Sequence, residues 1–127
     1  MQLADFFMIN SGLEKYVDVA DGLNRIRNNK TVYKVILNSF VKGNQFEEMK
    51  QQLEAGSIED AIRSAHTLKG IAANLSLPVL YEVSLEAESQ LKNGESVDDI
   101  LPRMDEILTK TKTFVNTVLE NLNDLEV

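Results

Sequence analysis

Cysteine and tryptophan are absent from the 127 residues of this chain, and histidine occurs only once. Without cysteine the chain offers neither a disulfide nor a thiolate, which is compatible with the cytoplasm, the localisation we expect. The first residues lack the basic segment and the apolar run of a secretory signal peptide, and no stretch is long and apolar enough to span a bilayer. The start at Met1 and the short C-terminal tail favour a free-standing protein.

Positive charge is also scarce in this sequence. Lysine and arginine number 13 against 20 acidic residues, which leaves a net charge of −7. Nucleic acid and anionic membranes need a cationic face, so neither is an expected partner. Hydrophobic residues make up 43% of the chain and charged residues 26%, a balance typical of a globular domain with its own core. We therefore predict a single domain over residues 1–127.

Signals for β-strands and for helix breaks are few. The only prolines are Pro78 and Pro102, and no run of alternating polar and apolar residues is bounded by turns. Short gaps between helices favour antiparallel neighbours. The pattern predicts an all-α fold, an up-down antiparallel four-helix bundle with one or two short N-terminal capping helices. The bundle helices are expected at roughly 31–54, 58–75, 77–93 and 98–123.

Local signals refine these helices. The last helix carries a heptad-like seam, typical of a helix packed nearly parallel to its neighbours, at Leu101, Met104, Leu108, Thr111, Val115, Val118, Leu122 and Leu125. Within 31–54 the apolar face changes at Gly43-Asn44, which predicts a kink or a change of face there. Pro78 suits the first turn of its helix, and Ser76 is the expected N-cap.

The single histidine, His66, lies in the run Ala65-His66-Thr67-Leu68-Lys69-Gly70. At about 100° per residue, His66 lies about 125° from the centre of the apolar stripe of helix 58–75, so its imidazole should face solvent. Residues three, four and seven positions apart share one strip of a helix surface. The strip that contains His66 also holds Ile62, Arg63, Lys69, Gly70 and Ala73.

These neighbours indicate what an exposed imidazole could do. A neutral imidazole is nucleophilic near pH 7, and Lys69 could offset the charge of a phosphoryl group bound to it. Gly70 costs about 1 kcal/mol relative to alanine inside a helix, and close approach of another backbone or of a phosphoryl group is the favoured explanation. Plainer interpretations stay open: a histidine at the core edge, a solvated lysine, and a glycine that allows tight helix packing.

Residues Ala65 to Leu75 closely resemble the signature of histidine-containing phosphotransfer (HPt) domains. The resemblance extends to a GLxR-like segment at Asp21-Gly22-Leu23-Asn24-Arg25 and to the first long bundle helix at Tyr33 through Phe40. It also extends to an acidic or amide position followed by a turn, here Glu88 and Gly94. The likeness covers roughly residues 18–120, and its specific part lies near residues 61–75.

In that family a histidine accepts a phosphoryl group from an aspartyl phosphate on a receiver domain and donates it to another receiver. The resemblance implies that His66 is the phospho-acceptor and that Lys69 stabilises the phosphoryl oxygens. It also implies that Glu88 orients the ring through a hydrogen bond. The expected docking surface comprises Ile62, Arg63, Gly70 and Ala73, with Phe6, Phe7 or Leu23 as further candidates.

The resemblance implies a phosphocarrier rather than an enzyme. No glycine-rich nucleotide motif occurs, so neither a nucleotide site nor autokinase activity is expected. No cofactor or metal is expected in this chain, and Mg²⁺ would belong to the partner receiver domain. The expected partners are response-regulator receiver domains and a hybrid histidine kinase in two-component signal transduction. We expect the protein to be a monomer.

Two residues depart from the family pattern. Ser76 stands where many members have glycine, and Ile71 stands where a small polar residue is common. We expect Ser76 to alter only the turn and Ile71 to pack at the edge of the bundle. Neither change removes a chemical group that phosphotransfer needs.

Two other functions remain as alternatives. A degenerate bundle could bind a receiver or a histidine kinase as an adaptor without carrying phosphate, although the presence of both His66 and Lys69 argues against it. The other alternative is a metal-binding or purely structural bundle. One histidine without cysteine leaves few transition-metal ligands, and no Glu-x-x-His pair occurs because residue 63 is arginine.

Overall fold

The computed structural model describes residues 1–126, and over this range the chain is helical, with an isolated bridge between Gln2 and Glu126 and no strand. The all-α prediction is confirmed. The elements in chain order are α1 (Leu3–Ile9), α2 (Leu13–Tyr16), α3 (Val19–Arg25), α4 (Lys30–Lys42), α5 (Gln45–Glu54), α6 (Ile58–Leu75), α7 (Pro78–Lys92), α8 (Leu101–Asn121) and the 3₁₀ turn η1 (Leu122–Asp124).

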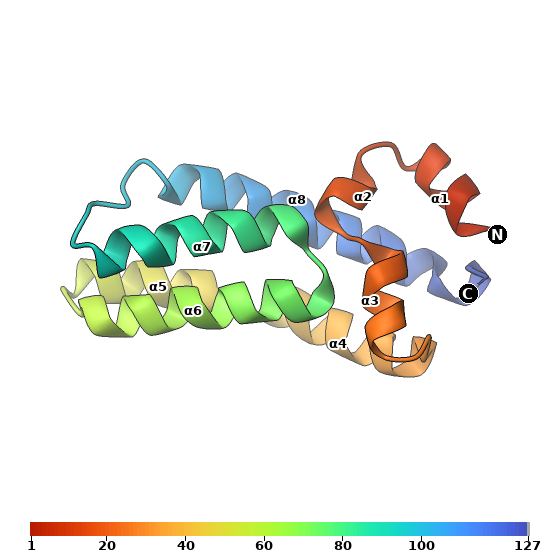
Figure 1. The fold of residues 1–127 in the computed structure, drawn as a ribbon, viewed down its shortest axis with the longest axis horizontal. Helices are drawn as coiled ribbons and strands as arrows, with labels where there is room; N and C mark the ends of the chain where they lie inside the picture. The colour runs from red at the N-terminus through yellow and green to blue at the C-terminus, as the bar shows by residue number, and fades with distance from the viewer. Residues whose placement is uncertain (127) are drawn as a thin grey trace.

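The four rods of the bundle are α6, α7, α8 and the pair formed by α4 and α5 (Figure 1). α6 packs between α5 and α7, and α8 packs against α7 and α4. Consecutive rods run in opposite directions, which is the predicted up-down arrangement. α1, α2 and α3 gather at the end where α6 passes into α7. The sequence predicts one or two short helices in this region, and the structure has three.

The core of the bundle confirms the seam predicted for the last helix. Buried positions recur along α8 and η1 at Met104, Thr111, Val115, Val118 and Leu122, while Leu101 and Leu108 are partly buried. A side chain of this size contributes about 1.5–3 kcal/mol when it is fully buried. The seam therefore packs inside the bundle.

The single helix predicted over 31–54 is two helices, α4 and α5. Gly43 ends α4 with an extended backbone (φ −69°, ψ 154°), and Asn44 is the N-cap of α5. A Cβ at Gly43 would lie 2.6 Å from the movable side-chain oxygen of Gln45 and 3.3 Å from the carbonyl oxygen of Phe40, so a larger residue needs only small adjustments here. Lys112 of α8 donates a hydrogen bond to the carbonyl of Gly43 (3.0 Å), which satisfies a carbonyl freed by the break. The break lies where the sequence predicts a kink.

The helix predicted from residue 98 begins at Leu101 instead. The amides of Ile100 and Leu101 both donate to the carbonyl of Val97, at 2.9 and 3.0 Å, so this segment forms a turn before α8. Pro102 stands in the first turn of α8, where a missing N–H costs little, as predicted.

The prediction that Ser76 caps the start of α7 is wrong. Ser76 ends α6 in the left-handed region (φ 58°, ψ 56°), and Leu77 takes the N-cap position of α7. The Ser76 hydroxyl donates to the carboxylate of Asp21 and accepts from Arg25 Nε (3.1 Å). Arg25 Nε also donates to Asp21 (2.9 Å), and the hydrogen bonds that Asp21 accepts from Ser76 and from Arg25 lower its pKa. Ser76 therefore links α3 to the C-terminal end of α6, the helix that carries His66, and it also shapes the turn between α6 and α7.

We predict that Ser76→Ala destabilises the protein more than Ser76→Gly does. Both variants lose the hydroxyl group and its hydrogen bonds, but alanine keeps a side chain in the left-handed region, which costs about 1 kcal/mol relative to glycine. Urea unfolding of the wild type and of the two variants measures the difference. Equal destabilisation by the two substitutions would contradict the prediction.

Candidate functional site

His66 lies near the middle of α6, and its side chain is 66% exposed. Ala65, one position before His66, and Leu68, two positions after it, are buried in the core. The imidazole is thus mostly exposed to solvent, as the helical wheel predicts, and the interpretation of His66 as a half-buried core-edge residue is not supported.

Glu88 of α7 contacts both His66 and Lys69 of α6. Its side chain is only 4% exposed, and one carboxylate oxygen, Oε2, lies 2.6 Å from His66 Nδ1. The other oxygen, Oε1, accepts a hydrogen bond from Lys69 Nζ at 2.5 Å. His66 and Lys69 are three residues apart and lie on the same face of α6, which packs against α7. One buried carboxylate therefore holds an imidazole and an ammonium group side by side.

Opposing influences act on the Glu88 carboxyl group. Burial would raise its pKa because desolvation penalises the charged form. The hydrogen bonds from Lys69 and His66, together with the charges of Lys69 and Lys92, outweigh burial and lower the pKa of Glu88 below its usual value. Glu88 is therefore ionised at neutral pH and accepts hydrogen bonds from both partners.

The hydrogen bond to Glu88 fixes the tautomer of His66. An ionised carboxylate only accepts hydrogen bonds, so the hydrogen in this contact belongs to His66 Nδ1. In a neutral imidazole the lone pair is then on Nε2, the nitrogen that does not contact Glu88. Because the His66 side chain is mostly exposed, the arrangement presents a nucleophilic nitrogen of defined identity to a reactant from solution.

Two more cations lie on this part of the surface. Lys92 lies one turn beyond Glu88 on α7, and its Nζ is 3.8 Å from Glu88 Oε1. Sequence reasoning missed Lys92, although its spacing of four residues from Glu88 is the usual one for an ion pair on a helix. Arg63, a predicted docking residue, is exposed one turn before His66 and pairs with Asp60 of the same helix.

The other predicted docking residues, Ile62, Gly70 and Ala73, lie on the same strip of α6 as His66. The small side chains at Gly70 and Ala73 project little from the helix, and these two positions form a low surface beside His66. Apart from the backbone of its own helix and its chain neighbours, no heavy atom of residues 1–126 lies within 4 Å of a Cβ placed on Gly70. Tight packing within the bundle therefore does not explain this glycine. Ala73 is exposed and Ile62 is partly buried.

Phe6 and Leu23 are fully buried, so both are excluded as docking candidates, whereas Phe7 is half-buried.

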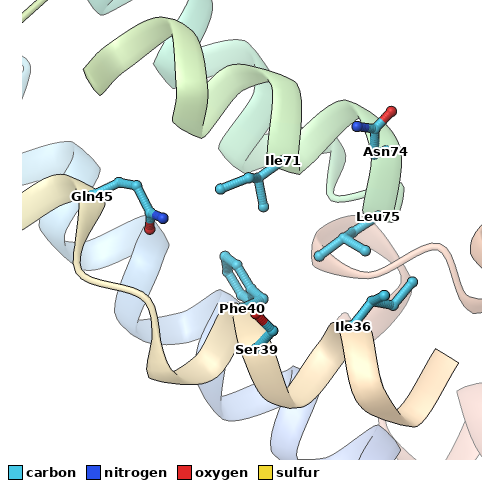
Figure 2. A pocket seen from close by; sticks show the side chains of 7 residues that line it. All are labelled: Ile36, Ser39, Phe40, Gln45, Ile71, Asn74 and Leu75. Atoms are coloured by element: carbon cyan, nitrogen blue, oxygen red, sulfur yellow. The ribbon is translucent and has the colours of Figure 1, made fainter. Parts of the chain in front are cut away.

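A groove of about 240 Å³ lies between α4 and α6, on the flank of the His66 strip (Figure 2). Ile71 points from α6 toward Phe40 of α4. Ile71 therefore packs at the edge of the bundle, as expected, and forms an apolar wall of the groove. The residues that line the groove are Ile36, Ser39, Phe40, Gln45, Ile71, Asn74 and Leu75.

The described residues contain no group of three or more histidine, aspartate or glutamate side chains placed to hold a metal ion. No helix within residues 1–126 has the length and apolar character needed to cross a membrane.

The family model for the Hpt domain matches residues 43–125, well over half of the chain. The chain therefore belongs to the Hpt domain family. The match includes His66, Lys69 and Glu88, whereas the resemblance noted for residues 18–42 lies outside it. No curated protein and no solved structure matches the chain. Membership implies histidine phosphotransfer in phosphorelays, in which Hpt domains act as phosphocarriers and response-regulator receiver domains are their partners.

Proposed function

We propose that this chain accepts a phosphoryl group on Nε2 of His66 from the aspartyl phosphate of a receiver domain and passes it to a second receiver. The single observation that carries the proposal is the contact between the buried Glu88 carboxylate and Nδ1 of the exposed His66. This contact leaves Nε2 unprotonated in the neutral ring and directed away from the carboxylate that holds the ring.

The chemistry of the transfer follows from this tautomer. The Nε2 lone pair forms a bond to phosphorus while the bond between phosphorus and the aspartyl oxygen breaks, and the electron pair stays on the aspartate. The ring becomes a phosphorylated imidazolium that keeps its hydrogen on Nδ1, and the Glu88 carboxylate offsets the new positive charge. Lys69, which shares the Glu88 carboxylate with His66, offsets the charge of the phosphoryl oxygens. The reverse sequence returns the group to an aspartate of the next receiver.

Docking supplies the remaining conditions for the reaction. In-line transfer requires the two proteins to align the reacting atoms and to exclude water. The low surface at Gly70 and Ala73 leaves room for the loops around a receiver's aspartate, with Ile62 and Arg63 at its other edge. The groove beside Ile71 extends this surface with apolar area. Mg²⁺ and the reactive aspartate belong to the receiver, and a hybrid histidine kinase is an expected source of the phosphoryl group.

The experiment that tests this proposal is transfer of labelled phosphate from a phosphorylated receiver, in the presence of Mg²⁺, to the wild type and to His66→Ala. Label on the wild type alone supports a carrier. The alternative adaptor predicts that both proteins bind the receiver and that neither takes label.

A further inference from the structure

Glu88 Oε1 has two lysine partners at different distances. Lys69 Nζ forms a hydrogen bond at 2.5 Å, whereas Lys92 Nζ lies at 3.8 Å, within ion-pair range but beyond a hydrogen bond. Within residues 1–126 neither lysine has another ion-pair partner. Lys69 is 21% exposed and Lys92 is 57% exposed, so the second ammonium is the freer of the two.

Phosphorylation of His66 sets up a competition for Lys69. A phosphoryl group brings nearly two negative charges and three acceptor oxygens next to the ring that Glu88 holds. The phosphoryl oxygens compete with Glu88 for the three N–H donors of Lys69, one of which donates to Glu88 Oε1 in the unphosphorylated protein. If Lys69 leaves, the Glu88 carboxylate, 4% exposed, loses its closest counter-charge beside a new anion. The carboxylate keeps the imidazolium as its partner at Oε2, but Oε1 is left in a buried position without the hydrogen bond that Lys69 supplied, which is unfavourable.

We propose that Lys92 takes over Glu88 Oε1 when Lys69 turns to the phosphoryl group. The exchange keeps Glu88 paired, so the carboxylate retains its hydrogen bond to His66 Nδ1 in the phosphorylated protein. Lys92 is then a positioning residue that acts through Glu88 without contacting the reacting atoms. The inference rests on the proposed function in that it takes the phosphorylated form of His66 as a working state of the protein.

Three features of the geometry support this exchange. Lys92 needs to move its ammonium by only about 1 Å to reach hydrogen-bond distance. Its spacing of four residues from Glu88 on one helix keeps the two side chains on the same face. Both lysines already lie on the same carboxylate oxygen, so the second replaces the first without a change in the position of Glu88.

The inference is testable without any receiver domain. Phosphoramidate is a small donor that phosphorylates exposed histidines, and His66 is the only histidine of the chain. In this reaction Nε2 forms the bond to phosphorus, the phosphorus–nitrogen bond of phosphoramidate breaks, and ammonia leaves with the electron pair. NMR signals of the lysine side chains are then compared between the two forms. We expect phosphorylation to shift the ammonium signals of both Lys69 and Lys92.

Variants separate the exchange from an ordinary surface ion pair. In the phosphorylated form, Lys92→Gln should lower the folding equilibrium constant about two- to fivefold, the range of one ion pair, and should shift the signal of His66 Nδ1. In the unphosphorylated form both effects should be clearly smaller, because Lys69 still donates a hydrogen bond to Glu88 and Lys92 is only a distant second partner. Lys92→Arg should behave like the wild type. The matched control is Lys110→Gln, because Lys110 is similarly exposed (52%) and pairs with Glu106 four residues earlier.

The outcomes are distinct for the two proposals. A Lys92 signal that phosphorylation leaves unchanged would overturn the exchange, as would a Lys92→Gln effect that is equal in the two forms. Failure of every receiver to label His66 would overturn the proposed function while leaving the NMR result valid. Exchange in the chemically phosphorylated protein supports the inference in either case.

Discussion

Gly70→Gln is expected to leave the fold intact and to slow phosphoryl transfer from a receiver about a hundredfold. Glutamine is a better helix former than glycine by about 0.5–1 kcal/mol, and residues 1–126 leave open space at this position, so stability should rise slightly. The same space is where we expect the receiver's loops to dock. A displacement of the reacting atoms by about 1 Å is enough for a loss of roughly a hundredfold.

Single-turnover transfer from a phosphorylated receiver measures this effect, and urea unfolding measures stability. Gly70→Ala should give an intermediate rate because its side chain is smaller. Asn116→Gln, an enlargement on an exposed position of α8, is the control and should transfer like the wild type. Phosphorylation by phosphoramidate should be unaffected in all variants, because the small donor needs no docking. A normal transfer rate in Gly70→Gln would show that the receiver does not approach this surface.

Glu88→Ala is expected to slow phosphorylation of Nε2 about tenfold, by analogy with the tenfold or greater loss when a group that orients a metal-binding histidine is removed. Without Glu88 the hydrogen is free to occupy either ring nitrogen, so Nδ1 also becomes a nucleophile. Glu88→Gln keeps an oxygen that accepts from Nδ1, and it should retain reaction at Nε2. Phosphorus NMR after treatment with phosphoramidate distinguishes the two isomers of phosphohistidine. An Nε2 product formed at the wild-type rate in Glu88→Ala would contradict this role.

The same carboxylate gives the stability a defined pH dependence. Burial opposes ionisation of Glu88, but its hydrogen bonds from Lys69 and His66 prevail and lower its pKa in the folded protein from the ordinary value of 4.5. A group with a lowered folded-state pKa stabilises fully above its unfolded pKa, and this contribution is lost as the pH falls through the folded-state pKa. The wild type should therefore lose stability below about pH 4.5 more steeply than Glu88→Gln, as urea unfolding at several pH values would show.

The sequence predicts the helices well where the signal is local. The helix expected at 58–75 has the bounds of α6, because its apolar stripe begins and ends with the helix. The junction at Gly43 shows the limit of such reasoning. The change of apolar face locates the bend, but the full break also involves Lys112, which comes from α8 and contacts the freed carbonyl. The role of Ser76 likewise depends on Asp21 and Arg25, more than fifty residues away.

The candidate site shows the same division between local and distant signals. The helical wheel alone places His66 in solvent and Lys69 beside it. The pairing of Glu88 with both side chains needs the register between α6 and α7, which the sequence supplied only through resemblance to a family. The groove near Ile71 depends on packing between helices, so it was not predicted. The pairing of Lys92 with Glu88, four residues apart on α7, is a local signal that sequence reasoning missed. Burial of Phe6 and Leu23 is equally a tertiary property, since amphipathic short helices do not reveal which neighbour covers them.

The central claim is that His66 carries the phosphoryl group, and transfer of labelled phosphate tests it most directly. A panel of phosphorylated receiver domains with Mg²⁺ is offered to the wild type, His66→Ala and His66→Gln, each with helical content checked by circular dichroism. We predict label on the wild type alone, labile in acid and stable in alkali, as expected for phosphohistidine. Folded wild-type protein that takes no label from any receiver, or label that persists in both His66 variants, would contradict the claim.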